Sequence, residues 1–254
     1  MLLKLADFNI EIKTLYNYII KQTKDYTVED CDADISLTNT QDDIETERKL
    51  SEGNFGDGYI ESIVTYRKIA EWLPLHNAFL LHSATFDVDG VGVAFAAHSG
   101  TGKTTHMRLW QKYLGDKMTV VNGDKPIVRF FENETNIPYV YGTPWNGKER
   151  LGTNTHSPLR HICFIERSKT NYVEKIAPKD AVDRIFNQVY MPKNPAAVMN
   201  TIRLINQLIS SCELWIIHCN MEPEAAKVAY EAIFNSEFGM RNSELNESQS
   251  DSVK

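Results

Sequence analysis

An apolar run that leads directly into a loop of small residues constrains the fold of this chain more than any other feature. Residues 91–97 alternate in the manner of a strand, and Ser99-Gly-Thr-Gly-Lys-Thr-Thr105 follows almost at once. Gly100 and Gly102 can adopt the positive φ that lets a backbone approach an anion closely. Residues 105–114 then place apolar side chains at helical spacing. This order predicts a phosphate-binding loop, because backbone N–H groups at the helix N-terminus would face the anion.

Each position of the loop has an expected role in binding a nucleotide. Lys103 is expected to reach the β- and γ-phosphates, and Thr104 to offer its hydroxyl to Mg²⁺. Ala97 stands where the usual pattern has its first glycine, and alanine can serve there if its φ stays negative. The strand before the loop and the helix after it disfavour an ordinary glycine-containing turn. The residues expected to bind the cofactor here are Ser99, Gly100, Thr101, Gly102, Lys103, Thr104 and Thr105.

Two polar residues stand at equal distances before and after Lys103, each at the end of an apolar run. His82 lies near the end of one run, and Asp124 follows another. In nucleotide-dependent phosphoryl transfer, an acid at a neighbouring strand end holds Mg²⁺, directly or through water, and a base orients the acceptor hydroxyl. We therefore expect Asp124 to share the metal with Thr104, and His82 to act on the acceptor side. The alternatives, a turn-forming aspartate and a core histidine, stay open at this point.

These motifs resemble, in order and spacing, the superfamily of HPr kinase/phosphorylase and ATP-dependent phosphoenolpyruvate carboxykinase. The likeness covers residues 78–150 and is carried by Leu81-His-Ser-Ala84, Ser99-Gly-Thr-Gly-Lys-Thr104 and Gly123-Asp124. It implies a carboxykinase-like P-loop fold, whose central sheet is mixed and not doubly wound and parallel. It also implies that His82 is a metal-site or acceptor-side residue. The paired aspartates of the family correspond to Asp124 and Lys125, so one acid is missing. Whether Asp124 acts as base, as metal ligand or as both stays open.

One further loop carries basic residues toward the same region. Residues 141–150 are rich in turn-forming residues and include Lys148 and Arg150. Basic side chains in loops are usually only solvated, but a nearby nucleotide would offer them a charged partner. We expect Arg150 to contact phosphate or substrate.

A small N-terminal unit is expected over residues 1–58. Apolar side chains alternate over 2–13, which predicts a strand, and 15–20 continues as a short amphipathic helix. Residues 29–47 hold acidic side chains and no basic ones. Such a charge run is typical of a solvated face or a mobile loop, so we expect an acidic loop within a small α+β unit.

The main domain is expected over residues 59–235. It begins with a helix at 60–75. Apolar runs then predict strands at 78–86, 91–97, 118–121, 126–131 and 160–165. From residue 177 onward the apolar spacing is helical, with one strand at 214–218, which predicts a helical C-terminal part. The tail, 236–254, has no apolar periodicity and is predicted to be disordered.

Composition restricts the class of partner. The chain has 254 residues, 42% of them hydrophobic, which is enough for one main core. A net charge of −7 without a Lys/Arg-rich run disfavours nucleic acid and anionic membranes as partners. We expect neither a leader nor a membrane span, because the first residues lack a basic start followed by a long apolar stretch and no segment approaches ~20 apolar residues. Its four cysteines lack metal-ligand spacing. We expect a cytoplasmic protein with reduced thiols that acts on a small molecule, peptide or protein, and a homo-oligomer is left open.

The expected activity is ATP- and Mg²⁺-dependent phosphoryl transfer from the γ-phosphate to a hydroxyl of such an acceptor. Asp124, His82 and Lys103 are the expected catalytic residues, and Thr104 and Asp124 the expected metal ligands. A non-catalytic nucleotide-binding regulatory module is the alternative, favoured by the missing second aspartate. A carboxykinase-type enzyme is less favoured, because the resemblance implies a much longer chain with a dedicated carboxylate-binding domain.

Overall fold

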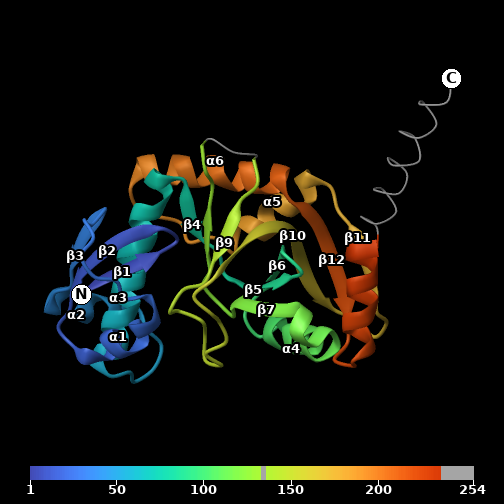
Figure 1. Cartoon of the computed structure of the whole chain (residues 1–254), viewed down its shortest axis with the longest axis horizontal. Coiled ribbons are helices and arrows are strands. Elements are labelled where there is room, and N and C mark those ends of the chain that lie inside the picture. Colours follow the sequence, from blue (N-terminus) through green and yellow to red (C-terminus); the bar gives the residue numbers. More distant parts are fainter. Residues whose placement is uncertain (133–135, 236–254) are drawn as a thin grey trace.

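A mixed β-sheet forms the centre of the computed structural model, which describes residues 1–132 and 136–235 (Figure 1). The main path of the sheet runs, in order, through β4 (Ala78–Leu80), β8 (Ile127–Arg129), β9 (Tyr139–Tyr141), β10 (His156–Arg167), β6 (Val91–Ala96), β5 (Ser83–Val88) and β7 (Met118–Asn122). A branch leaves β10 through β12 (Glu213–Cys219) and continues to β11 (Tyr172–Lys175). Helices accompany this sheet, so the expectation of an α/β protein with a mixed sheet is confirmed.

The long strand β10 joins two parts of the sheet. Its first residues, His156–Pro158, pair antiparallel with β9. Its later residues pair parallel with β6 on one side and with β12 on the other. The strand therefore connects the antiparallel strands β4, β8 and β9 to the part of the sheet that carries the small-residue loop.

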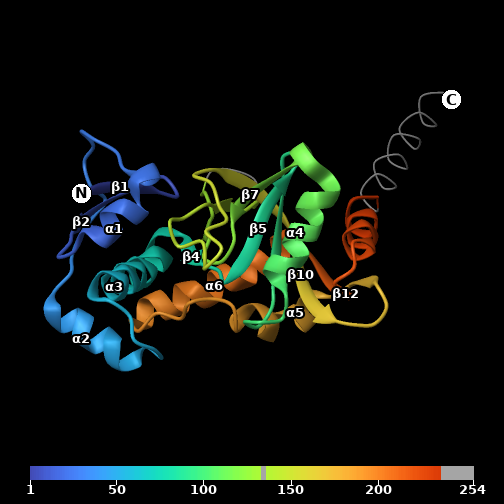
Figure 2. The ribbon, with the colours of Figure 1, turned by 90° about the horizontal axis from the view of Figure 1, so that it is seen from below.

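Helices cover both faces of this part of the sheet. Successive side chains of β10 point to opposite faces, and both sets are apolar over 162–165, so each face has to be buried against a helix. Ile162 and Phe164 belong to a buried cluster with side chains of α5 (Pro178–Phe186) and α6 (Pro195–Ser211). The alternating Cys163 and Ile165 belong to a second cluster, with Trp110 of α4 (Lys103–Leu114) and a last helix at 224–235. Figures 1 and 2 show α6 and α4 on opposite sides of the strands.

The prediction of a single strand at 2–13 is wrong, because these residues form a β-hairpin of two strands. β1 (Leu2–Leu5) pairs antiparallel with β2 (Phe8–Lys13). Ala6 and Asp7 between them have φ of 49° and 60°. This left-handed backbone reverses the chain where the alternation alone indicates a continuous strand.

The acidic segment 29–47 is not one loop either. β3 (Ile35–Thr38) adds to β2 in parallel. The helix α2 (Gln41–Leu50) comes next, and Thr40 and Asp43 form a capping box at its start. Carboxylates near the helix N-terminus are favourable there because the aligned peptide dipoles make that end positive. Part of this acidic segment therefore lies in the helix α2.

The N-terminal unit shares a core with the elements that come after it in the chain. After α1 (Asn17–Gln22), η1 (Lys24–Tyr26) and α2, the helix α3 (Asp57–Trp72) leads to η2 (Leu73–His76). A third buried cluster combines Leu3 and Ile10 with Ile69 of α3 and with Leu80 of β4. The helix predicted at 60–75 is confirmed as α3, and its last predicted residues, 73–75, lie in the 3₁₀ turn η2. The boundary at residue 58 stays a prediction.

Most other differences between the predicted and the observed elements concern short or interrupted strands. The run predicted as one strand at 78–86 divides into β4 and β5, because the backbone N–H of Leu81 binds Pro126 and that of His82 binds Gln188. The short strands β9 and β11 are not predicted at all; β11 lies at the sheet edge with mostly exposed side chains. The 3₁₀ turn η3 (Gly115–Lys117) follows α4.

The C-terminal tail at 236–254, predicted to be disordered, lies outside the described residues. Over 1–132 and 136–235, none of the helices combines the length and the apolar character that crossing a membrane requires.

Candidate functional site

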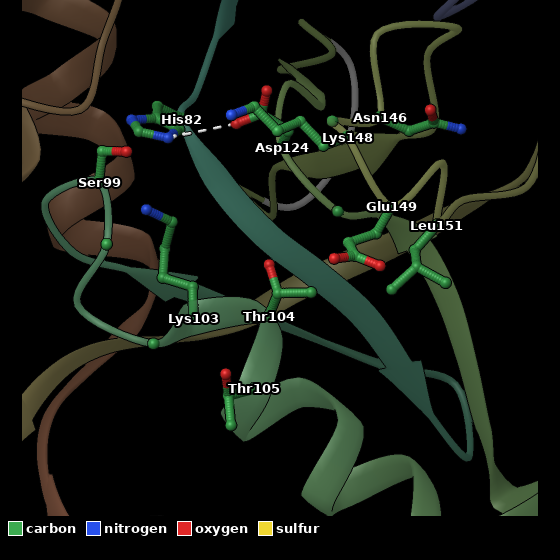
Figure 3. Close-up of a pocket in the computed structure, with 14 residues that line it drawn as sticks. His82, Ser99, Lys103, Thr104, Thr105, Asp124, Asn146, Lys148, Glu149 and Leu151 are labelled. Atoms are coloured by element: carbon green, nitrogen blue, oxygen red, sulfur yellow. Dashed lines mark ion pairs between the residues drawn. The ribbon is translucent and has the colours of Figure 1, made fainter.

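The loop between β6 and α4 forms one wall of a cavity of about 410 Å³ (Figure 3). The opposite wall comes from the break between β4 and β5, from the end of β7 and from the loop after β9. The lining residues are His82, Ser99, Gly100, Gly102, Lys103, Thr104, Thr105, Gly123, Asp124, Asn146, Gly147, Lys148, Glu149 and Leu151. The predicted loop, His82 and Asp124 are thus brought together.

The loop reverses the chain before α4 through two glycines. Gly100 and Gly102 have φ of 78° and 122°, where an L side chain would be strained. The backbone N–H of Thr101 donates to His98 O at 3.2 Å, and that of His106 donates to Gly102 O at 2.9 Å, which starts the helix. N–H groups in the first turn of a helix have no acceptor within it. Those of α4 border the cavity and can bind an anion.

Lys103 lies inside the turn made by this loop, with only 8% of its surface exposed. Its Nζ donates to the carbonyl oxygen of Ala97 at 2.7 Å. Burial lowers the pKa of Lys103, and the negative charge of Asp124 opposes that shift. The ammonium is therefore held next to the cavity by a neutral acceptor, which a charged ligand can replace.

On the other wall, the side chains of His82 and Asp124 contact each other, as the dashed line in Figure 3 marks. Their Nε2 and Oδ1 atoms are 3.2 Å apart. Burial by itself would raise the pKa of Asp124, but the hydrogen bond from His82 and the positive charges of Lys125 and Lys103 outweigh it and lower the pKa. Asp124 is a carboxylate at neutral pH. The Nζ of Lys125 lies 3.8 Å from the same Oδ1.

The turn that carries Asp124 is built by its neighbour Asn122. The fully buried Asn122 accepts from the backbone N–H groups of Asp124 and Lys125 at 2.8 and 2.7 Å. Its amide nitrogen donates to the carbonyl and hydroxyl oxygens of Thr143, each at 3.0 Å. Asn122 thus makes the turn, and the Asp124 carboxylate is left to face the cavity.

The loop after β9 closes the cavity on its outer side. Trp145 anchors this loop to α3, where its Nε1 donates to the carbonyl and hydroxyl oxygens of Ser62 at 3.1 and 3.0 Å. Glu149 lies on the cavity and forms an exposed ion pair of 2.5 Å with Arg108 of α4. The loop is therefore held from two sides by elements distant from it in the sequence.

Two predicted cofactor residues are not on the cavity wall. Arg150 is exposed and has a φ of 51°, and it is not among the lining residues. Thr101 is likewise absent from the lining. Arg167, at the end of β10, donates from Nε to Thr101 O at 3.2 Å and from Nη2 to Gly100 O at 2.5 Å. The roles predicted for Arg150 and Thr101 stay predictions.

Sequence reasoning does not find Arg167 or Gln188, and among the lining residues of the loop after β9 it singles out only Lys148. The signal for Arg167 is a basic residue at the end of a predicted strand, which is the same signal that selects His82 and Asp124. Gln188 gives no local signal, because it follows α5 and reaches the site only through pairing with the β4–β5 break.

The donors on the wall suit a magnesium ion that is held together with phosphates. Thr104 supplies a hydroxyl and Asp124 a carboxylate. Mg²⁺ commonly binds one or two carboxylates and takes its other ligands from water and substrate phosphates. Among the described residues, no three His, Cys, Asp or Glu side chains gather as a metal site by themselves. A Mg²⁺ ion held by these two residues would take its remaining ligands from water or from phosphate oxygens.

Comparisons with known proteins give little more. No family model matches this chain, and no curated protein does either. Among solved structures, the Hpr(Ser) kinase/phosphatase from Coxiella burnetii aligns with a TM-score of 0.39 and 8% identity. That alignment covers 66% of this chain and 96% of the other. A likeness of this size carries no argument, so function is inferred from the geometry of the site.

Proposed function

We propose that this protein is a carboxykinase-like P-loop kinase, which uses ATP and Mg²⁺ to phosphorylate a hydroxyl of a small molecule, peptide or protein. One observation carries the proposal: the loop at the start of α4 and the His82–Asp124 pair line the same cavity from opposite sides. Phosphoryl transfer needs phosphate binding on one side and management of metal and acceptor on the other.

On the phosphate side, the backbone N–H groups of residues 99–104 bind the phosphate oxygens, except that of Thr101, which donates to His98 O. Lys103 exchanges its contact with Ala97 O for the β- and γ-phosphates, because a hydrogen bond between two charged groups is stronger than one to a neutral carbonyl. Donors that are already in place stabilise the charge that develops during transfer.

Asp124 on the acceptor side and Thr104 on the phosphate side would hold the metal between them. Mg²⁺, when bound, supplies positive charge that neutralises the phosphates. The lowered pKa of Asp124 favours the role of metal ligand over that of base, because a group that holds a proton weakly is a poor proton acceptor. His82 orients Asp124 and the acceptor hydroxyl.

The experiment is transfer from γ-labelled ATP to candidate acceptors, including the protein itself. Labelled product in the wild type and its loss in Lys103→Ala support the kinase. Nucleotide binding without label transfer to any acceptor, and without hydrolysis, contradicts it.

The second candidate is a nucleotide-binding regulatory module. The position of Lys125 favours it, because this ammonium lies 3.8 Å from Asp124 and competes with a metal for the carboxylate. If the protein is such a module, Lys125→Ala does not gain phosphoryl transfer, and ATP binding changes the affinity of the protein for a partner instead.

A further inference from the structure

A segment after α5 is fixed to the cavity wall although nothing in its sequence relates it to phosphate binding. Val189 forms an isolated bridge with Leu81. The backbone N–H of His82 donates to Gln188 O at 2.7 Å, and that of Tyr190 donates to Leu80 O at 3.2 Å. These bonds bring Gln188 between the β4–β5 break and the loop, where only 5% of its surface is exposed.

The surroundings of the Gln188 amide decide its orientation. Three acceptors face one end of it: Ala97 O at 3.0 Å, His82 O at 3.3 Å and His82 Nδ1 at 3.3 Å. With the amide nitrogen at that end, one of its two hydrogens binds Ala97 O and the other is shared between the carbonyl oxygen and Nδ1 of His82. With the oxygen there, the amide would face acceptors only, and an unpaired buried amide is costly. The nitrogen therefore faces Ala97 and His82.

This orientation constrains both walls of the cavity. His82 Nδ1 accepts from Gln188, so it carries no proton, and the proton of the neutral ring is on Nε2, directed at Asp124 Oδ1. The second bond of the same amide goes to Ala97 O, which also accepts from Lys103 Nζ at 2.7 Å. One side chain thus contacts His82 and the first peptide of the loop.

We propose that Gln188 is a positioning residue, which selects the Nε2–H tautomer of His82 and fixes the distance between the His82–Asp124 pair and the loop. The effect of Gln188 on catalysis rests on the proposed kinase function, whereas its effect on the His82 tautomer is independent of that function. A hydrogen-bonded neighbour that holds a site residue in one orientation affects turnover by holding the reacting groups in productive geometry.

The first test measures the tautomer in the free protein. Imidazole ¹⁵N spectra are recorded with ¹⁵N-labelled histidine at a pH where His82 is neutral, and the His82 signals are assigned by their loss in His82→Gln. We expect an unprotonated Nδ1 in the wild type. In Gln188→Glu the new carboxylate accepts at this position, so Nδ1 gains a proton. A protonated Nδ1 in the wild type overturns the proposal, whatever the protein catalyses.

The second test separates hydrogen bonding from packing. Gln188→Met keeps the length and volume of the side chain but removes the donor, and Gln111→Met on the exposed side of α4 is the matched control. We expect Gln188→Met to lower single-turnover transfer by about tenfold, with ATP affinity within about twofold of the wild type. Equal rates in both variants, with the wild-type tautomer retained, show that Gln188 only fills space. If no variant transfers phosphate, the kinase proposal fails and the spectra still decide the tautomer.

Discussion

The two walls of the cavity are built in different ways. The phosphate-side wall takes all its residues from one continuous segment, 99–105, which joins the loop after β6 to the first turn of α4. The acceptor-side wall is formed by His82 and Asp124, with Gln188 bonded to His82, and these residues come from three different parts of the chain. Local backbone geometry therefore shapes the first wall, whereas strand pairing and one buried amide shape the second.

This difference has a physical consequence. In the phosphate-side wall, glycine conformation and unpaired helix N–H groups provide the binding capacity. The acceptor-side wall depends on buried polar groups, and each of these is costly when it loses its partner. We expect substitutions in the first wall to change nucleotide binding, and those in the second to change transfer or stability.

The largest expected effect is on transfer. Asp124→Asn keeps the shape of the side chain and removes its charge, so transfer should fall by about a hundredfold or more while metal-free nucleotide binding survives. Single-turnover assays and nucleotide titrations measure the two effects. Asp116→Asn, at an exposed position, is the control. Full activity in Asp124→Asn would assign the acid role to another residue and remove the contrast between the walls.

Substitutions in the phosphate-side wall should have the largest effect on nucleotide binding. ATP with Mg²⁺ stabilises the wild type by about 2.7 kcal/mol at a concentration of about 100 Kd, because it binds the native state alone. Lys103→Ala should lose most of that stabilisation. Thermal unfolding with and without nucleotide measures it. Equal shifts in the two proteins would show that the loop does not bind the phosphates.

Asn122→Ala tests whether the acceptor-side wall depends on its buried turn. The change leaves the N–H groups of Asp124 and Lys125 without their acceptor, so unfolding should become easier by about 1–3 kcal/mol. Urea denaturation measures this, and Asn206→Ala on the exposed side of α6 is the control. An unchanged midpoint would mean that water replaces the amide and that the turn is held by its neighbours.

The smallest effect concerns pH. The pKa of Asp124 is lowered in the folded protein, so the unfolded chain takes up its proton first as the pH falls. The contribution of the carboxylate to stability is present above the ordinary carboxyl pKa and is lost as the pH falls through the lowered one. The difference in unfolding free energy between the wild type and Asp124→Asn should therefore narrow between about pH 5 and about pH 3. A constant difference would show that Asp124 has no favourable partners.

The sequence predicts those parts of the site whose determinants are adjacent. Residues 91–105 carry the alternation of β6, the glycines of the turn and the start of α4 in a row. Asp124 is predicted because it ends an apolar run. Where the determinant is a partner elsewhere in the chain, prediction fails, as in the division of the strand at 78–86 and the short strand β9. The hairpin at Ala6–Asp7 is missed for a local reason, because alanine does not signal the positive φ that Ala6 adopts.

The amino-acid sequence by itself determined the loop, the helix that follows it, the mixed α/β class and the strand-end positions of His82 and Asp124. Only the tertiary structure decided that His82 Nε2 lies 3.2 Å from Asp124 Oδ1, that Asn122 makes the turn and that Gln188 contacts both His82 and Ala97. The reason is the range of the forces involved. Backbone conformation and helix ends depend on neighbouring residues, whereas a buried hydrogen bond forms only after the sheet has brought distant segments together.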